Sequence, residues 1–237
     1  MKVLVVGGSG ATGKQLIEQL IQKGHTVRAI IRKTAKLPQN WLNAKKIDLV
    51  YRNILEIDQN ELVSHLKDCQ AIALTLGHNL TLKGIFGQPA TLVTQALSNL
   101  TKAAEKNGVP MKIVLMNTAG NRNPDMDKGL SFNENLATAI IRVLLPPHSD
   151  NEQAAEFLRS QIGSKHKNIN WVIVRPDSLI DSDVVTGYKA YPSPTRSAIF
   201  NPGKVSRINV GHFMASLISD EHLWIKWMGQ MPVLYNS

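Results

Sequence analysis

The sequence predicts an α/β fold built on a doubly wound, mostly parallel sheet with helices on both faces. Short runs of β-branched and aliphatic residues alternate with amphipathic helical patterns through most of the chain. The runs are continuous rather than interrupted by polar residues, which is typical of strands buried on both faces. Regular alternation of strand and helix implies crossover connections. We expect the 237 residues to form one domain over 1–237, a size that allows a full hydrophobic core.

Each strand is expected at one of these apolar runs. The first run leads directly into a glycine-rich turn, and the helix that follows, over 13–23, stops at Gly24, a residue type suited to helix ends. In chain order, the expected strands are Lys2–Val6, Thr26–Ile31, Ile47–Tyr51, Ala71–Leu76, Lys112–Met116 and Trp171–Val174.

The later helices are recognised by their ends. Asp58, with Glu61 three residues later, matches a capping box. Asn107-Gly108 is a left-handed stop for a helix that begins near Pro89. Two more helices are expected to open at Ser131 with Glu134 and at Ser149 with Glu152, and a last one covers about 210–219.

Residues 176–207 lose this regularity. The segment is rich in Asp, Ser, Pro and Gly, and a loop region of this length in a compact domain is usually functional or disordered. It follows the carboxyl end of a strand, where ligands bind in such sheets. We therefore expect 176–237 to form a loop-rich substrate region.

Composition argues against several classes of protein. The lone Cys69 cannot form an internal disulfide or a cysteine-rich zinc site, so no metal is expected and a reducing cytoplasm fits. Because the glycine stretch follows the first strand so closely, we expect no cleavable leader. The most apolar run, Ala137–Leu145, is interrupted by Arg142 and is too short to span a membrane.

The net charge of +9 is spread along the chain, without a basic block. This pattern favours a solvated surface over nucleic-acid binding.

The stretch at 7–14, GGSGATGK, can be read in two ways. From its second glycine it approaches a triphosphate-binding loop, but Gln15 replaces the hydroxyl residue that binds Mg²⁺. From its first glycine it is G-x-x-G-x-x-G between a buried strand and a helix. In this reading Gly7 permits the turn, Gly10 lets the backbone approach a pyrophosphate, and Gly13 lets helix and strand pack closely. The second reading predicts a Rossmann-type dinucleotide site.

The residues after the second strand indicate which dinucleotide is bound. An NAD site usually has a carboxylate about 20 residues beyond the glycine turn, yet no Asp or Glu occurs between Gln19 and Ile47. Arg32 and Lys33 follow the strand instead, and a guanidinium matches the 2′-phosphate of NADP. We expect NADP as the cofactor, with Arg32 as the principal contact. The alternative is that both residues are ordinary solvated charges.

With these motifs, the sequence resembles the atypical short-chain dehydrogenase/reductases, in particular their NmrA-like and biliverdin-IXβ/flavin reductase branch. The resemblance covers most of the chain. It rests on the glycine stretch and on Ile31-Arg32-Lys33, Thr75-Leu76-Gly77, Met116-Asn117-Thr118-Ala119, Val174-Arg175-Pro176 and Gly211-His212-Phe213-Met214.

The resemblance implies a set of cofactor contacts. Asn53 and Ile54 would flank adenine, and Asn53 stands where such proteins usually have Asp. The full implied set is Gly7, Ser9, Gly10, Ala11, Thr12, Gly13, Arg32, Lys33, Asn53, Ile54, Thr75, Leu76, Gly77, Arg175 and Pro176.

The chemistry departs from that of ordinary short-chain dehydrogenases. Those enzymes use a Tyr with a Lys four residues later, and none of the four tyrosines here has a Lys at that spacing. Hydride transfer to an acceptor that needs little acid assistance remains available. Thr118, His148 and Asp177 are the catalytic candidates near the nicotinamide end. For His148, an ordinary position on a surface loop is an equal alternative.

The sequence therefore predicts an NADPH-dependent reductase of a flavin-like, quinone-like or other conjugated small-molecule acceptor, whose anionic groups would suit the basic surface. One alternative is a non-catalytic NADP-binding redox sensor of the NmrA-like type. Another is a carbonyl- or sugar-nucleotide-modifying enzyme, which the missing Tyr–Lys pair disfavours. No nucleic acid or membrane partner is expected, and a monomer and a homodimer both remain open.

Overall fold

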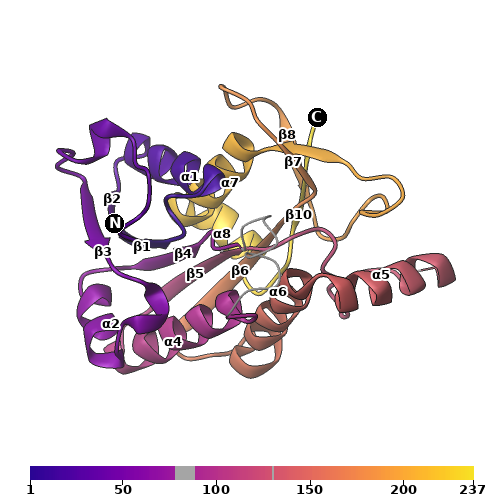
Figure 1. Cartoon of the computed structure of the whole chain (residues 1–237), viewed down its shortest axis with the longest axis horizontal. Coiled ribbons are helices and arrows are strands. Elements are labelled where there is room, and N and C mark those ends of the chain that lie inside the picture. Colours follow the sequence, from indigo (N-terminus) through magenta and orange to yellow (C-terminus); the bar gives the residue numbers. More distant parts are fainter. Residues whose placement is uncertain (78–88, 130) are drawn as a thin grey trace.

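The computed structural model describes residues 1–77, 89–129 and 131–237. Its centre is an eight-stranded sheet in the order β3-β2-β1-β4-β5-β6-β10-β8 (Figure 1). All neighbours pair in parallel except β8, which is antiparallel to β10 at one edge. The strands are β1 (Lys2–Val6), β2 (Thr26–Ile31), β3 (Ile47–Tyr51), β4 (Ala71–Leu74), β5 (Met111–Met116), β6 (Ile169–Pro176), β8 (Tyr188–Tyr191) and β10 (Val233–Asn236), while β7 (Ser178–Ile180) and β9 (Lys204–Ser206) form a separate parallel pair. The predicted doubly wound, mostly parallel sheet is confirmed.

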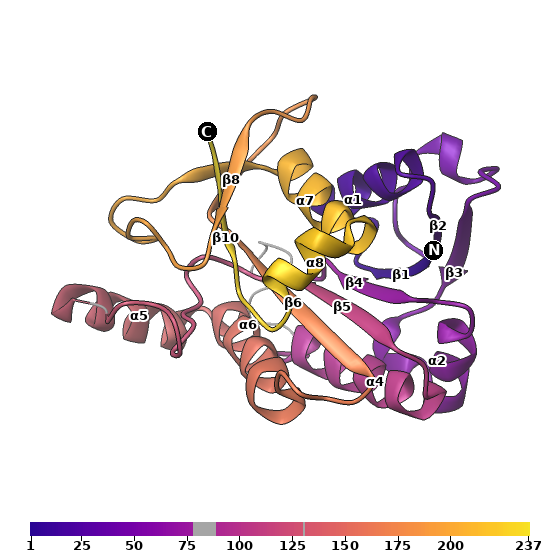
Figure 2. The ribbon, with the colours of Figure 1, turned by 180° about the vertical axis from the view of Figure 1, so that it is seen from behind.

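Helices cover both faces of this sheet (Figures 1 and 2). One face carries α1 (Ala11–Gln22), α7 (Arg207–Ser219) and α8 (Glu221–Trp227), and the other carries α2 (Gln59–Leu66), α4 (Leu92–Asn107) and α6 (Pro146–Glu156). A further helix, α5 (Phe132–Leu144), extends away from the body of the molecule. The short segments are η1 (Gln39–Trp41), η2 (Ile54–Glu56) and the π-helical η3 (Phe157–Ile162). Within the described ranges, no helix combines the length and apolar character needed to cross a membrane.

The central strands β1, β4, β5 and β6 are buried on both faces, because consecutive side chains of a strand point to opposite sides of the sheet and helices cover both sides. The strand β3 was predicted to be buried in the same way, but it lies at the edge of the sheet and none of its residues is buried. In β1, Leu4 and Val6 pack in the same cluster as residues of α2 and α4. Val3 and Val5 pack with residues of α1 and α7. All four side chains are at most 1% exposed, which is the reason for the continuous apolar run in the sequence.

A close helix contact holds α1 in place. Gly211 of α7 approaches α1 so closely that a Cβ atom there would lie 2.8 Å from the backbone nitrogen of Leu16. A larger residue at this position would force the two helices apart. Since α1 begins at the glycine-rich turn, this contact helps to position the turn at the carboxyl edge of the sheet.

Most predicted element ends are confirmed. The strands β1, β2 and β3 have the expected bounds. Asp58 caps α2 by accepting from the backbone nitrogens of Asn60 and Glu61. Gly108 ends α4 in the left-handed conformation with φ of 73°, and a full capping box opens α5 at Ser131.

Other ends differ from the prediction. Helix α6 begins at Pro146 rather than Ser149, because proline fits the first helical turn, where its missing N–H would have no intrahelical partner. Helix α7 begins three residues earlier than expected because Ser206 caps it. The segment 176–207, expected as irregular, contains β7, β8 and β9. The sequence did not indicate α8 or β10, and β4 ends two residues early, at Leu74.

Candidate functional site

The glycine-rich turn between β1 and α1 is packed against the end of β4. Gly7 has φ of +89°, and a Cβ atom there would lie 2.6 Å from the backbone nitrogen of Leu76. A Cβ atom on Gly13 would lie 2.2 Å from the carbonyl oxygen of Gly7 and 2.7 Å from Oγ1 of Thr75. Neither position has room for a side chain, so the turn requires glycine at both.

Gly10 differs because it is less crowded. It is exposed, and the nearest atom to a Cβ placed there is the carbonyl oxygen of Gly7 at 3.3 Å. Gly10 is also the N-cap of α1, and no side chain caps this helix. The first-turn N–H groups, together with the helix dipole, form a suitable site for an anion. Ser9 is half-buried and Ala11 is exposed beside it, while Thr12 is buried.

The end of β2 adds positive charge at the same edge of the sheet. Arg32 and Lys33 are exposed, and neither side chain has an ion pair or hydrogen bond with another residue of the described ranges. Arg28, within the strand, is instead engaged by Asp48 at 2.6 Å and by the carbonyl oxygen of His65 at 2.8 Å. Of these three cations, Arg32 and Lys33 are therefore the ones open to a ligand.

The other predicted cofactor residues differ in their solvent exposure. Asn53 follows β3, where its side chain accepts from Leu55 N at 3.3 Å and donates to Glu56 Oε1 at 2.9 Å. Ile54 is 5% exposed. Thr75 is buried behind Gly13, whereas Leu76 is half-buried and Gly77 is exposed. The structure thus brings Gly7, Gly13, Thr75 and Leu76 together as the wall of the turn.

The structure corrects the prediction for Arg175, which is buried at the end of β6; the neighbouring Pro176 is buried as well, and its predicted contact stays a prediction. Arg175 is 0% exposed. Its guanidinium donates twice to the carboxylate of Asp127 and once each to the carbonyl oxygens of Asn121, Pro192 and Met231. A guanidinium has five N–H donors, so none remains for a cofactor. Arg175 instead joins three distant segments of the chain.

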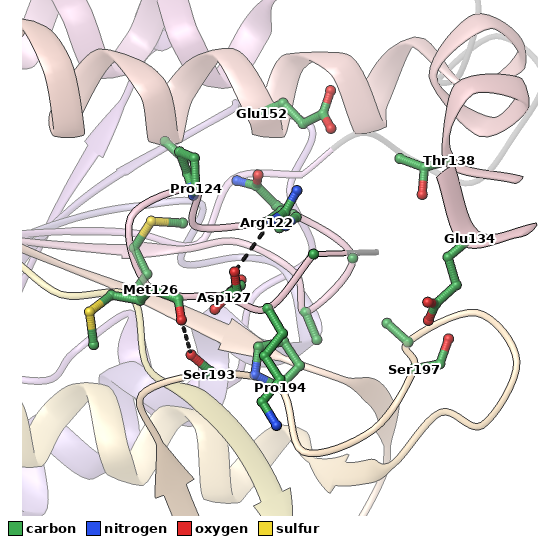
Figure 3. Close-up of a pocket in the computed structure, with 18 of the residues that line it drawn as sticks. Arg122, Pro124, Met126, Asp127, Glu134, Thr138, Glu152, Ser193, Pro194 and Ser197 are labelled. Carbon is green, nitrogen blue, oxygen red and sulfur yellow. Dashed lines mark hydrogen bonds between the residues drawn. The ribbon is translucent and has the colours of Figure 1, made fainter. Parts of the chain in front are cut away.

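A cavity of about 880 Å³ opens beside the carboxyl ends of β5 and β6 (Figure 3). Its walls come from residues 119–129 after β5, from α5 and α6, and from residues 191–199. The last of these belong to the predicted substrate region. Cavities of about 300–1,000 Å³ are typical of small-molecule sites, so this cavity is the candidate acceptor site.

The charged residues of the cavity wall are partly paired. Arg142 binds Glu152, and Arg159 binds Glu156 and Asp125. Asp127 is engaged by the buried Arg175. The wall also carries Arg122, Lys128 and Arg196, which have no carboxylate partner among the described residues. Their charge favours a ligand with an anionic group.

Two of the three catalytic candidates lie next to Gly120, although neither Thr118 nor His148 is itself among the described residues that line the cavity. Cε1 of His148 lies 3.5 Å, and Oγ1 of Thr118 lies 3.7 Å, from the place of a Cβ atom on Gly120, which lines the cavity. Nε2 of His148 lies 3.4 Å from Oε1 of Glu152, one turn later in α6. His148 therefore lies in a helix and is not a surface-loop residue.

Glu152 joins this group to Arg142. The Arg142 guanidinium donates to both carboxylate oxygens, at 2.6 and 2.7 Å. Burial disfavours the charged form of Glu152, but its contacts with His148 and Arg142 outweigh this and lower its pKa to about 2. The carboxylate is thus charged beside the imidazole. Sequence reasoning used Glu152 only as a helix-start signal, although its spacing of four residues from His148 predicts contact on one helix face.

Asp177 has a structural position away from this group. One carboxylate oxygen accepts from Ser178 N at 2.9 Å and the other from Gly203 N at 2.8 Å. Burial raises the pKa of the Asp177 carboxyl, and the two backbone hydrogen bonds oppose this. Asp177 is not among the described residues that line the cavity. The contacts indicate that it joins β7 to the segment before β9.

The parallel sheet order, the glycine turn and the uncapped start of α1 define a dinucleotide-binding α/β protein. The chain belongs to the NAD(P)H-binding family, whose model matches residues 7–221. An uncharacterised chloroplastic protein of Arabidopsis thaliana is 27% identical over 186 residues, which are 78% of this chain and 61% of that protein. The chain therefore spans less than two thirds of that relative's length.

Solved structures of oxidoreductases have the same fold. A short-chain dehydrogenase/reductase from Veillonella parvula in complex with NADP has a TM-score of 0.70 and 13% identity, over 99% of this chain and 94% of that chain. A candidate NADH-flavin reductase from Streptococcus pneumoniae has a TM-score of 0.70 and 16% identity, over 100% of both chains. The predicted resemblance to atypical short-chain dehydrogenase/reductases is confirmed at the level of fold.

Proposed function

We propose that the protein is an NADPH-dependent reductase whose acceptor is a flavin-like, quinone-like or other conjugated small molecule bound in the cavity beside β5 and β6. The observation that carries this proposal is the exposed cationic end of β2 beside the uncapped start of α1. Both lie on the same edge of the sheet as the cavity, because the carboxyl ends of parallel strands share one edge. Bound NADPH would supply the hydride.

The residues at this edge fit a phosphorylated dinucleotide. The first-turn N–H groups of α1 would bind the pyrophosphate, and the open side of Gly10 leaves space for it. The guanidinium of Arg32, supported by Lys33, would bind the 2′-phosphate. Arg28 and Asp48 are engaged with each other, so this carboxylate is not free to take the place of the missing acidic residue of an NAD site.

The cavity wall supports an acceptor with an anionic group. Arg122, Lys128 and Arg196 would contact that group. The charged Glu152 orients the imidazole of His148 through Nε2. The other ring nitrogen, Nδ1, lies 3.9 Å from the Cβ position of Gly120 at the cavity wall, and the imidazolium form of His148 would carry a transferable proton there. His148, with the hydroxyl of Thr118 beside it, is the proton donor of the proposal.

Titration of the protein with NADPH and with NADH, followed by fluorescence, tests the cofactor assignment. We expect NADPH to bind at least about tenfold more tightly, which corresponds to about 1.4 kcal/mol. Equal affinities, or no binding of either, would contradict the proposal.

A second assay follows the loss of dihydronicotinamide absorbance with riboflavin, FMN and soluble quinones. Turnover of at least one acceptor is expected. Binding of NADPH without turnover across the panel would support the alternative of a non-catalytic NADP-binding redox sensor.

A further inference from the structure

The outward face of α5 carries a row of large apolar side chains. Phe132, Leu136, Ile140 and Leu144 follow one another at four-residue intervals and are 81%, 53%, 51% and 59% exposed. This spacing places them along one ridge of the helix, which we call the α5 ridge. Because α5 extends away from the body of the molecule (Figures 1 and 2), the described part of the chain leaves the ridge uncovered.

The orientation of α5 is set by its opposite face. Glu134, Thr138 and Arg142 line the cavity, and Figure 3 shows the first two pointing toward it. Arg142 is held by its two hydrogen bonds to Glu152 of α6. A rotation of α5 that buried the ridge would withdraw these side chains from the cavity wall. The ridge therefore faces outward as long as the cavity is intact.

We infer that the α5 ridge binds the α5 ridge of a second copy of this chain, with the two helices packed antiparallel about a twofold axis. Ridges formed by residues four apart interdigitate in the commonest class of helix packing. A twofold interface uses the same surface on both subunits, so one uninterrupted ridge is its own complement. In this arrangement, Leu136 lies opposite Ile140 of the second copy, because position 138 is the midpoint of the ridge.

The exposed area agrees with a reversible dimer. At the observed exposures, the four side chains present on the order of 400 Å² of apolar surface per copy. Complete burial of these side chains would remove at most about 800 Å² from the two copies together. About 65% of a homodimer interface is apolar, which gives a total near the lower limit of about 1,200 Å² for standard-size specific interfaces. An interface of this size is sufficient for weak dimerisation, in which the fraction of dimer rises with protein concentration.

The charges of α5 favour a second copy over a lipid surface. Helices that lie on membranes are rich in Lys and Arg on their polar face. The charged residues of α5 are Glu134 and Arg142. Glu134 is engaged in the capping box with Ser131, and Arg142 is engaged by Glu152. Glu134 would repel anionic headgroups, and the single cation of the helix, Arg142, is already neutralised by Glu152.

Sedimentation velocity of the full chain over a wide concentration range tests the inference. The wild-type protein is expected to change from monomer to dimer as concentration rises. Leu136→Glu should raise the dissociation constant at least tenfold, because the twofold axis places each substitution in the interface twice. Ile225→Glu, at a 61% exposed apolar residue of α8, is the matched control and should leave the dimer unchanged. Circular dichroism would verify that both variants are folded.

A cross-linking experiment tests the antiparallel register. Leu136→Cys and Ile140→Cys proteins, mixed with a short bifunctional thiol reagent, should cross-link more than either protein alone. The native Cys69 is buried and does not interfere. The inference is overturned by a wild-type protein that stays monomeric throughout, by a dimer that Leu136→Glu leaves intact, or by a monomer that instead binds anionic vesicles through the ridge.

Discussion

The two ends of the proposed site are built in different ways. The cofactor edge, formed by β1, α1 and β2, depends on backbone atoms and on residues close together in the sequence. The cavity side depends on side chains that join distant segments: Arg175 binds Asp127 and also reaches Met231, which is 56 residues away. At the cofactor edge, adding one side-chain atom is expected to destabilise the fold. On the cavity side, removing one side-chain partner is expected to do so. We therefore expect substitutions at the two ends to differ in the size of their effects on stability and on binding.

The largest effect is expected from Arg175→Met on the cavity side. The substitution leaves the carboxylate of Asp127, whose side chain is 4% exposed, without a positive charge beside it and with the backbone N–H of Asn123 as its remaining hydrogen-bond donor. Breaking a buried pair in this way costs about 3–5 kcal/mol of unfolding free energy, measurable by urea denaturation.

Arg207→Met is the control for this substitution, because Arg207 is bound to an Asp181 whose side chain is 88% exposed. That change should cost less than about 1 kcal/mol. Equal losses of unfolding free energy in the two variants would contradict the claim that the buried Arg175 pair contributes more to stability than the exposed Arg207 pair.

Gly13→Ala tests the cofactor edge by adding one atom. The new Cβ would lie 2.2 Å from the carbonyl oxygen of Gly7, and overpacking of this kind costs about 3 kcal/mol. NADPH binding should be lost with it. Gly10→Ala is the matched control: its Cβ would lie 3.3 Å from the same carbonyl oxygen, a contact that a small shift relieves, so it should cost less stability than Gly13→Ala while NADPH binds more weakly. A Gly13→Ala protein as stable as wild type would contradict the packing argument.

Arg32→Gln tests the charge at the cofactor edge. Loss of a charge-assisted hydrogen bond should weaken NADPH binding by about 1.5–3 kcal/mol and leave NADH binding unchanged, since NADH has no 2′-phosphate. Parallel titrations with both nucleotides measure this. Lys45→Gln, an exposed cation before β3 at the opposite edge of the sheet, serves as the control. Equal losses for both nucleotides would indicate a nonspecific effect of charge.

Glu152→Gln is expected to have the smallest effect on stability. The pKa of Glu152 is lowered to about 2 in the folded protein, so its contribution to stability is fully present above the ordinary glutamate pKa of about 4.3. That contribution is lost as the pH falls toward 2. The carboxylate is partly exposed, so the change is modest. Thermal unfolding at a series of acid pH values should show a shallower decline for the variant, and parallel curves would exclude this role.

The cofactor edge was largely predictable because its signals are local. Positive φ at Gly7 and close approach at Gly13 restrict these positions to glycine, and a pattern of glycines can be read directly. The cavity side was less predictable. Arg175 follows a strand and matches a family motif, but its burial depends on partners at 121–127, 192 and 231. No local pattern brings these segments together.

The sequence by itself determined the alternation of strands and helices, the glycine turn and the cationic end of β2, because each follows from side-chain periodicity, backbone conformation or charge within a short stretch. Only the tertiary structure decided that Arg175 is buried, that β10 enters the sheet between β6 and β8, and that the α5 ridge faces outward. Those outcomes depend on which distant segments pack together, and that choice is made by the whole core rather than by any one segment.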